Sequence, residues 1–234
     1  MRDPLTIAVA QPRCLAYDVL ANARSHAEAV RAGRVRVVVF PEMSLTGYEF
    51  DAPPVDADDP RLAPIVAACA ETGSLALVGA PVAGDAGRRH IGVLAVDGGG
   101  ARVAYRKMWL GGAEPEHFVP GDAPAVVEVA GWRLGIAVCK DTGVPRHAAD
   151  TAALGIDGYV AGALDSAAEW GVQDERARRI AAEHGVWVAT ASFAGRTGGG
   201  YTDAAGRSRI WARDGSVIAE AGPEPGALVR ATLT

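Results

Sequence analysis

Short apolar runs, rich in β-branched residues and bounded by Gly, Pro and Asp, recur along the whole chain and predict about a dozen β-strands. They fall at residues 5–11, 35–40, 74–80, 91–96, 102–106, 125–129, 133–138, 158–161, 186–191, 208–211, 217–220 and 228–232. Several runs, such as those at 37–40, 75–80 and 135–138, are apolar almost without interruption. This pattern is typical of strands that are covered on both faces.

Helical spacing appears near both ends of the chain. Asp18 precedes apolar positions at helical intervals that end at Gly33, which predicts a capped helix after the first strand. Similar patterns predict helices at 62–72, 146–154 and 172–184, whereas 74–138 holds only strands and turns. The glycines at 98–100 are read as a hairpin, not a phosphate loop, because no helix pattern follows them. We expect one α/β domain, residues 1–234, with two sheets and helices outside.

Composition and charge narrow the possible partners. The 234 residues carry a formal net charge of −5, and basic residues adjoin only in pairs, so we expect neither nucleic acid nor membrane as a partner. The apolar N-terminal run is too short for a secretory signal, which predicts a cytoplasmic protein. The three cysteines show no C-x-x-C spacing, which argues against a disulfide framework and a zinc cluster.

Three residues with chemical potential follow predicted strands. Glu42 comes after the run at 37–40, Lys107 follows the strand at 102–106 on the side of Val103 and Tyr105, and Cys139 ends the strand at 133–138. Strand ends of α/β sheets are where ligands bind. A cysteine there exposes its sulfur, and the following backbone N–H groups are free to stabilise an oxyanion. Taken singly, each has a plainer reading as a solvated charge or a core thiol.

Taken together and in order, these segments resemble the nitrilase superfamily of carbon–nitrogen hydrolases. FPEMSLTGY resembles the family's glutamate motif, YRKMWL with the downstream E-x-x-x-F-x-P-G-D its lysine motif, and GIAVCKDTGVP its nucleophile motif. The resemblance covers about residues 5–232 and implies a four-layer α-β-β-α sandwich that commonly forms homodimers. It implies Glu42 as general base, Cys139 as nucleophile, and Lys107, helped by the N–H of Lys140, as the stabiliser of the oxyanion. No cofactor and no metal are implied.

The resemblance also implies a second glutamate that holds the lysine; Glu114 is preferred over Glu116. A metal site made of Glu114, Glu116 and His117 is the alternative reading, but no second ligand group at suitable spacing follows. Asp141 makes the chain more like amidases than true nitrilases.

Tyr48, Trp109, Lys140 and Asp165 are candidate substrate-binding residues. Relatives often have an aromatic residue at the position of Lys140 and a histidine at that of Trp109, so the shape of the pocket stays open. Lys140 either lowers the thiol pKa through space or contributes only its N–H. His147, eight residues after Cys139, is expected on the surface.

The resulting prediction is a hydrolase that cleaves a small amide or carbamoyl compound through a thioester on Cys139. Alternatives are an acyltransferase or nitrile hydrolase of the same fold, or a non-catalytic binding member. The sequence does not identify the substrate or the acyl acceptor.

Overall fold

The computed structural model describes residues 2–234, in which two six-stranded sheets face each other. The first sheet has the order β14-β1-β2-β3-β4-β5 and the second the order β13-β12-β9-β8-β7-β6. The strands of the first sheet are β1 (Leu5–Gln11), β2 (Val37–Val39), β3 (Leu75–Ala83), β4 (Arg89–Asp97), β5 (Gly100–Arg106) and β14 (Ala227–Leu233). Those of the second sheet are β6 (Ala125–Val129), β7 (Trp132–Val138), β8 (Gly158–Ala163), β9 (Trp187–Ser192), β12 (Arg209–Trp211) and β13 (Val217–Glu220).

Each sheet has three parallel strands at its centre. In the first sheet β1, β2 and β3 run parallel, with Ile7 opposite Val37 and Val37 opposite Leu75. In the second sheet β7, β8 and β9 run parallel, with Leu134 opposite Gly158 and Gly158 opposite Trp187. The outer strands pair antiparallel, including the predicted hairpin of β4 and β5. The carboxyl end of β2 therefore lies inside the first sheet, and that of β7 lies beside the edge strand β6 of the second.

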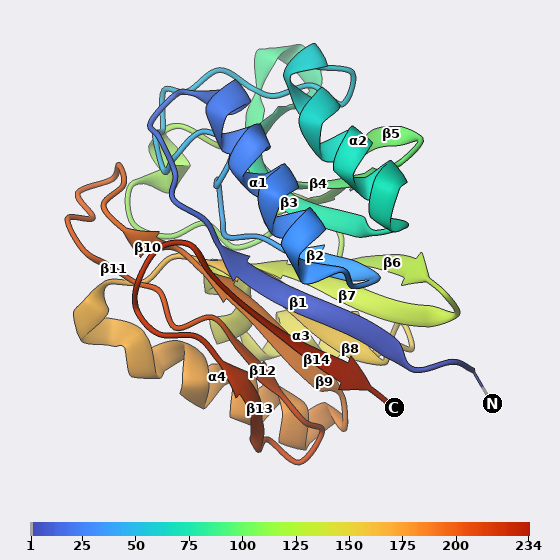
Figure 1. Ribbon diagram of the computed structural model, residues 1–234. Helices are drawn as coiled ribbons and strands as arrows, with labels where there is room; N and C mark the ends of the chain where they lie inside the picture. Colours follow the sequence, from blue (N-terminus) through green and yellow to red (C-terminus); the bar gives the residue numbers. More distant parts are fainter. Residues whose placement is uncertain (1) are drawn as a thin grey trace.

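Within residues 2–234, four α-helices cover the outer faces: α1 (Val19–Gly33), α2 (Ala63–Thr72), α3 (Pro145–Ala152) and α4 (Trp170–His184). The Asp18 side chain accepts a hydrogen bond from the Ala21 backbone at 3.0 Å, as expected of an N-cap. Helices α1 and α2 lie above the first sheet and α4 below the second (Figure 1). The four layers predicted from the sequence, helix, sheet, sheet and helix, are thus confirmed.

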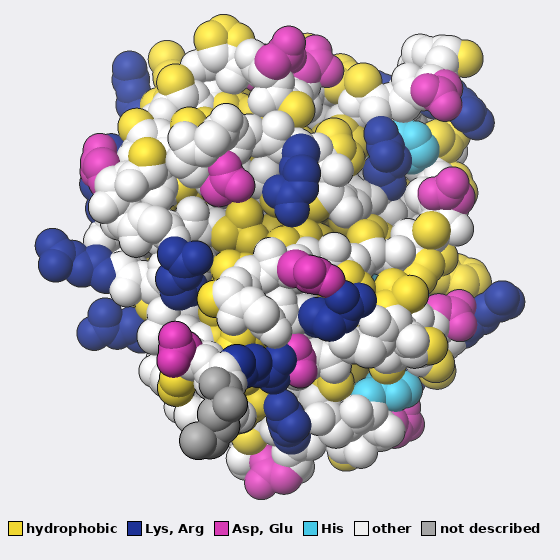
Figure 2. Space-filling view, turned by 90° about the vertical axis from the view of Figure 1, so that its right-hand side faces the viewer, with side chains coloured by type: hydrophobic (Ala, Val, Ile, Leu, Met, Phe, Trp, Pro, Cys, Tyr) yellow, Lys and Arg dark blue, Asp and Glu magenta, His cyan; other side chains and the backbone are white. Residues whose placement is uncertain are grey.

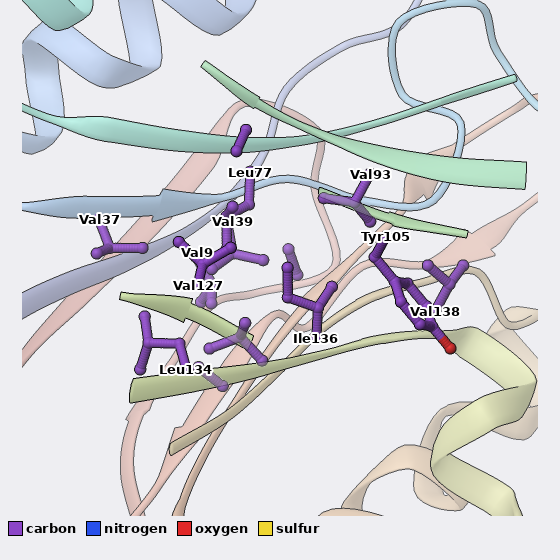
Figure 3. Packing of buried hydrophobic residues seen from close by; sticks show 14 of the residues in the cluster. Val9, Val37, Val39, Leu77, Val93, Tyr105, Val127, Leu134, Ile136 and Val138 are labelled. Atoms are coloured by element: carbon purple, nitrogen blue, oxygen red, sulfur yellow. The ribbon is translucent and has the colours of Figure 1, made fainter. Parts of the chain in front are cut away.

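Alternation along the central strands explains their continuous apolar runs. In β2, Val37 and Val39 point into the core between the sheets, while Val38 packs with α1 and α2. Figure 3 shows the inner core, where valines of β1 and β2 meet Val127, Leu134 and Ile136 of β6 and β7. Both faces are buried, so no polar alternation is possible.

The surface carries charges of both signs. On the face drawn in Figure 2, hydrophobic side chains form a strip across the centre, with basic and acidic side chains scattered around it. Among the described residues, no helix has the length and apolar character needed to cross a membrane.

Candidate active site

The ends of two strands and a following 3-10 turn bring Glu42, Lys107 and Glu114 together. Glu42 follows β2, Lys107 follows β5, and Glu114 begins a 3-10 turn (Glu114–Glu116). The Lys107 ammonium donates to Glu42 Oε1 at 2.6 Å and to Glu114 Oε1 at 2.7 Å. All three side chains are almost wholly buried. Buried charges are tolerated when they are paired in this way.

Glu114 is held from two further sides. Its Oε2 accepts from the backbone N–H of Gly111 at 2.7 Å, and its Oε1 accepts from the Tyr48 hydroxyl. Glu116, the competing candidate, is exposed. The second carboxylate on Lys107 is therefore Glu114, the residue preferred from the sequence.

Glu42 keeps one oxygen free of partners. Its Oε1 accepts from Lys107, whereas the buried Oε2 has no hydrogen-bond partner among the described residues. Burial raises the pKa of the Glu42 carboxyl above its ordinary value, although the Lys107 charge opposes the shift. Burial alone would lower the pKa of the Lys107 ammonium, but the Glu42 and Glu114 carboxylates outweigh it and raise that pKa. An unpaired, proton-attracting carboxylate oxygen is suited to accept a proton.

Cys139 lies at the end of β7, where the chain turns sharply into a 3-10 helix (Cys139–Gly143). Its φ of 43° is in the left-handed region, which non-glycine residues adopt rarely. The thiol is partly exposed and lies 3.3 Å from the carbonyl oxygen of Leu164. Burial and the Glu42 charge raise the pKa of the thiol, while Lys107 acts in the opposite direction. The thiol is therefore protonated at rest and needs a base before it can attack.

A pocket of about 200 Å³ opens over these groups. Lys107, Glu114 and Cys139 line it together with Tyr48, Lys140 and the aromatic rings of Phe50 and Tyr201. A larger cavity, of about 680 Å³, is also bordered by the glycine-rich segment 198–200 and shares Tyr201 with this pocket. That cavity is lined by Arg13, Cys14 and Arg196 and by none of the converging charged residues.

Two of the predicted substrate-binding residues, Tyr48 and Lys140, line the pocket, and two do not. The Trp109 side chain is 38% exposed, and its backbone N–H donates to Asp141 Oδ1 at 2.9 Å. Asp165 is buried directly after Leu164, and burial raises the pKa of its carboxyl. Phe50, Leu164 and Tyr201, which also line the pocket, were missed by the sequence analysis. The three consecutive glycines before Tyr201 were the sequence feature that could have indicated a loop bordering the pocket.

Asp141 joins the cysteine and lysine segments. Its carboxylate accepts from the backbone N–H groups of Val138 and Trp109, each at 2.9 Å, and from the Tyr105 hydroxyl at 2.7 Å. Figure 3 shows the hydroxyl of Tyr105 lying beside Val138. One buried carboxylate thus binds the backbone just before Cys139 and the backbone just after Lys107, and so fixes the two segments relative to each other.

The expectation that His147 lies on the surface is wrong. Its Nε2 lies 2.8 Å from the Tyr105 hydroxyl and its Nδ1 lies 2.8 Å from the Tyr159 hydroxyl. The ring is buried because α3 turns back over the second sheet and places this position between the helix and β8. His147 thereby supports Tyr105 and, through it, Asp141. Within residues 2–234, no group of three or more His, Cys, Asp or Glu side chains is arranged to hold a metal ion.

Comparison with known proteins gives consistent matches over nearly the whole chain. The family model described as carbon–nitrogen hydrolase matches residues 6–234. A curated Pseudomonas protegens protein, described as a hydrolase in the pqqF 5′ region, is 32% identical over 225 residues, covering 92% of this chain and 78% of that protein.

Solved structures show the same fold. An amidase from Nesterenkonia sp. AN1, in a mutant form bound to butyramide, superposes with a TM-score of 0.87 at 25% identity, covering 98% of this chain and 90% of that one. Nit3 of Saccharomyces cerevisiae, a member of the nitrilase superfamily, gives 0.87 at 19% identity with the same coverage. XC1258 of Xanthomonas campestris, with an arsenic adduct in its active site, gives 0.86 at 21% identity, covering 99% and 91%.

Proposed function

Because the chain belongs to the carbon–nitrogen hydrolase family, we propose that it hydrolyses the C–N bond of a small amide or carbamoyl compound, with Cys139 as the nucleophile. The observation that carries this proposal is the shared pocket: a cysteine at a strained strand end opens into the same 200 Å³ space as a lysine clamped between two buried glutamates. Such a set supplies a nucleophile, a base and a fixed positive charge.

In the first step, Cys139 Sγ attacks the carbonyl carbon while the thiol proton passes to Glu42. The free Oε2 of Glu42 supports this role, because it is the oxygen not engaged by Lys107. The carbonyl oxygen becomes an oxyanion. Lys107 and the backbone N–H of Lys140 stabilise it, since fixed donors in a site that excludes water stabilise developing charge strongly.

In the second step, the tetrahedral intermediate collapses and the C–N bond breaks. The proton held by Glu42 moves to the leaving nitrogen, which departs as ammonia or an amine and leaves a thioester on Cys139. Water then attacks the thioester carbon and gives a proton to Glu42. That proton returns to the sulfur as the carboxylic acid leaves, which restores the resting site.

Glu114 and Tyr48 serve in this scheme as the groups that hold Lys107. Glu114 is fixed by the Gly111 N–H and the Tyr48 hydroxyl, so the ammonium has one place to lie. Tyr48 also forms a wall of the pocket, whereas Trp109, which follows β5 and Lys107, and Asp165, which follows β8, do not line it. The size of the pocket favours a short acyl chain, in keeping with the butyramide bound by the Nesterenkonia amidase.

The test is ammonia release from a panel of short amides, carbamoyl compounds and nitriles. We expect turnover of at least one amide by the natural chain and a loss of at least about 10³-fold in kcat/KM for Cys139→Ser, Glu42→Gln and Lys107→Met. Full activity in any of these variants contradicts the mechanism. Formation of a substituted amide when an amine is added identifies acyl transfer, the alternative that keeps the thioester. A protein that turns over none of the panel and shows no selective labelling of Cys139 is a binding member instead.

A further inference from the structure

Lysine is almost absent from this chain except at the pocket. Of the 23 basic side chains, only Lys107 and Lys140 are lysines, and all others are arginines. Both lysines line the pocket that contains Cys139. Lys140 is thus the one lysine outside the buried Glu42–Lys107–Glu114 cluster, and its place beside the pocket is the feature that sets it apart from the arginines.

The two lysines differ in their partners. Lys107 is buried between Glu42 and Glu114, whereas Lys140 is exposed at the pocket mouth. The Lys140 ammonium makes no ion pair or hydrogen bond with any described residue. Its aliphatic stem lies against Gly111, where an added Cβ atom would be 3.1 Å from Lys140 Cδ. The missing side chain at Gly111 leaves this stem room beside the pocket.

The carboxylate oxygens of the side chains that line the pocket already have hydrogen-bond donors within the protein. The carboxylate of Glu114 is already occupied by Lys107, Tyr48 and the Gly111 N–H. Tyr201 lines the same pocket and also the larger cavity, and its hydroxyl has no hydrogen-bond partner among residues 2–234. Of the side chains that line the pocket, the two left unengaged are Lys140, whose ammonium only donates, and Tyr201, whose hydroxyl can donate; the free Oε2 of Glu42 is not part of this lining. A complementary ligand supplies acceptors and negative charge.

We propose that the substrate is a short amide with a carboxylate at the other end of its acyl chain, and that Lys140 binds this carboxylate with the help of Tyr201. The inference rests on the proposed function for the position of the amide at Cys139. Lys140 is then a specificity-determining residue: it selects for charge at the mouth, while Lys107 acts on the carbonyl group below. An anionic substrate is also drawn towards the mouth before it is bound.

The first test does not depend on turnover. Iodoacetate and iodoacetamide carry the same electrophilic carbon and differ by one negative charge, so the ratio of their alkylation rates at Cys139 measures the charge preference of the pocket. The ratio is normalised to that for 2-mercaptoethanol, and peptide mass mapping separates Cys139 from Cys14. We expect Lys140→Met to lower the normalised ratio about fivefold and Lys140→Glu to lower it further, as the strength of a partly solvated ion pair implies.

A control separates this role from a general effect of charge. Arg146 is exposed at the start of α3 and does not line the pocket. Arg146→Met should leave the iodoacetate ratio as in the natural chain. An equal fall in both alkylation rates in Lys140→Met, with the ratio unchanged, would mean that Lys140 acts on the thiol and not on the ligand, and overturns the proposal.

The second test uses substrates. Succinamate and butyramide present the same amide with and without the carboxylate, and 3-aminopropanamide presents a positive charge instead. We expect the natural chain to favour succinamate over butyramide at least about fivefold in kcat/KM, mainly through KM, and Lys140→Glu to shift the preference towards 3-aminopropanamide. Equal use of all three by the natural chain and by Lys140→Glu refutes the substrate class but leaves the hydrolase intact. Failure to hydrolyse any amide is a failure of the proposed function, and the alkylation ratio still decides the role of Lys140.

Discussion

The backbone of Glu42 passes so close to Gly162 that a Cβ atom at Gly162 would lie 2.9 Å from the Glu42 nitrogen and 2.7 Å from the carbonyl oxygen of Phe40. Gly79, on the other sheet, approaches the same segment: a Cβ atom there would lie 2.3 Å from the carbonyl oxygen of Pro41. The loop that carries the proposed base is therefore held between β3 of one sheet and β8 of the other. The atoms that such a Cβ would meet belong to the backbone of the loop, so a rotation of a side chain could not relieve the clash.

Gly162→Ala should misplace Glu42 and lower kcat/KM by at least about tenfold, because small displacements of catalytic groups are costly. The matched control is Gly158→Ala. It lies in the same strand and on the same side, but the tightest contact of its added methyl group would be the end of the Leu134 side chain, at 3.1 Å, and the Trp187 backbone oxygen would lie at an ordinary 3.6 Å. Steady-state kinetics of both variants, with circular dichroism to confirm folding, make the comparison. Similar kcat/KM values for the two variants would show that the contact between Gly162 and the Glu42 loop does not position the base.

The pH dependence of the reaction follows from Glu42. Burial raises the pKa of its carboxyl from the ordinary 4.5 to about 8. The base works only when it is deprotonated, so kcat/KM should rise with pH, and the midpoint of this acid limb should lie well above 4.5 and towards 8. Because Glu42 and Lys107 interact strongly, the limb reports the pair. A pH–rate profile from pH 4 to 10 checks this, and a flat profile between 5 and 8 would contradict it.

Acid should destabilise the fold through His26, which supports the Glu42 loop from α1. His26 Nε2 lies 2.9 Å from the Ser44 hydroxyl, and burial lowers the pKa of the ring to about 4. The folded state disfavours the charged ring, so this contribution is complete above pH 6.5 and is lost as pH falls towards 4. At pH 5 the loss amounts to about 2 kcal/mol. Urea unfolding of the natural chain and of His26→Gln should give a shallower pH slope for the variant; parallel slopes would exclude His26 as the source.

Removing the charge of Asp141 should weaken the link between the cysteine and lysine segments. An amide at this position turns one acceptor oxygen into a donor that faces N–H or O–H groups, so Asp141→Asn should cost about 3 kcal/mol of unfolding free energy. Asp150→Asn is the control, since Asp150 forms an exposed pair with Arg146 on the adjacent helix and should change stability by less than about 0.5 kcal/mol. Denaturant unfolding of both variants measures these changes. Equally small losses of unfolding free energy in Asp141→Asn and Asp150→Asn would show that Asp141 does not stabilise the fold in this way.

The sequence was most informative where local patterns determine structure. The cap at Asp18 and the stop at Gly33 fixed the first helix. Both features depend on neighbours within a few residues. Period-2 alternation predicted Val103, Tyr105 and Lys107 on one side of the strand, but a register shift in β5 places Val103 against the outer cluster under α1 and α2, while Tyr105 is part of the inner core and Lys107 is buried. The short pair β10 (Ala194–Gly195) and β11 (Ala204–Ala205), which holds Tyr201 at the pocket, was not predicted, because two-residue strands have no period.

Long-range contacts were the other gap. The residues next to His147 in the sequence do not indicate that its two ring nitrogens lie within hydrogen-bond distance of the hydroxyls of Tyr105 and Tyr159, which are 42 and 12 residues away. The same holds for the approach of Gly79 and Gly162 to one loop from opposite sheets, because neither strand is adjacent to that loop in the chain.

The central claim, that Cys139 carries the acyl group, is tested most directly by rapid acid quenching of the natural chain during turnover of a short amide, followed by mass analysis of the peptide that contains Cys139. The account predicts that this peptide gains the mass of one acyl group in the first turnover and that Cys139→Ser forms no such adduct and releases no ammonia above background. Ammonia release by Cys139→Ser at the rate of the natural chain, or an acyl group found on a different residue, would contradict it.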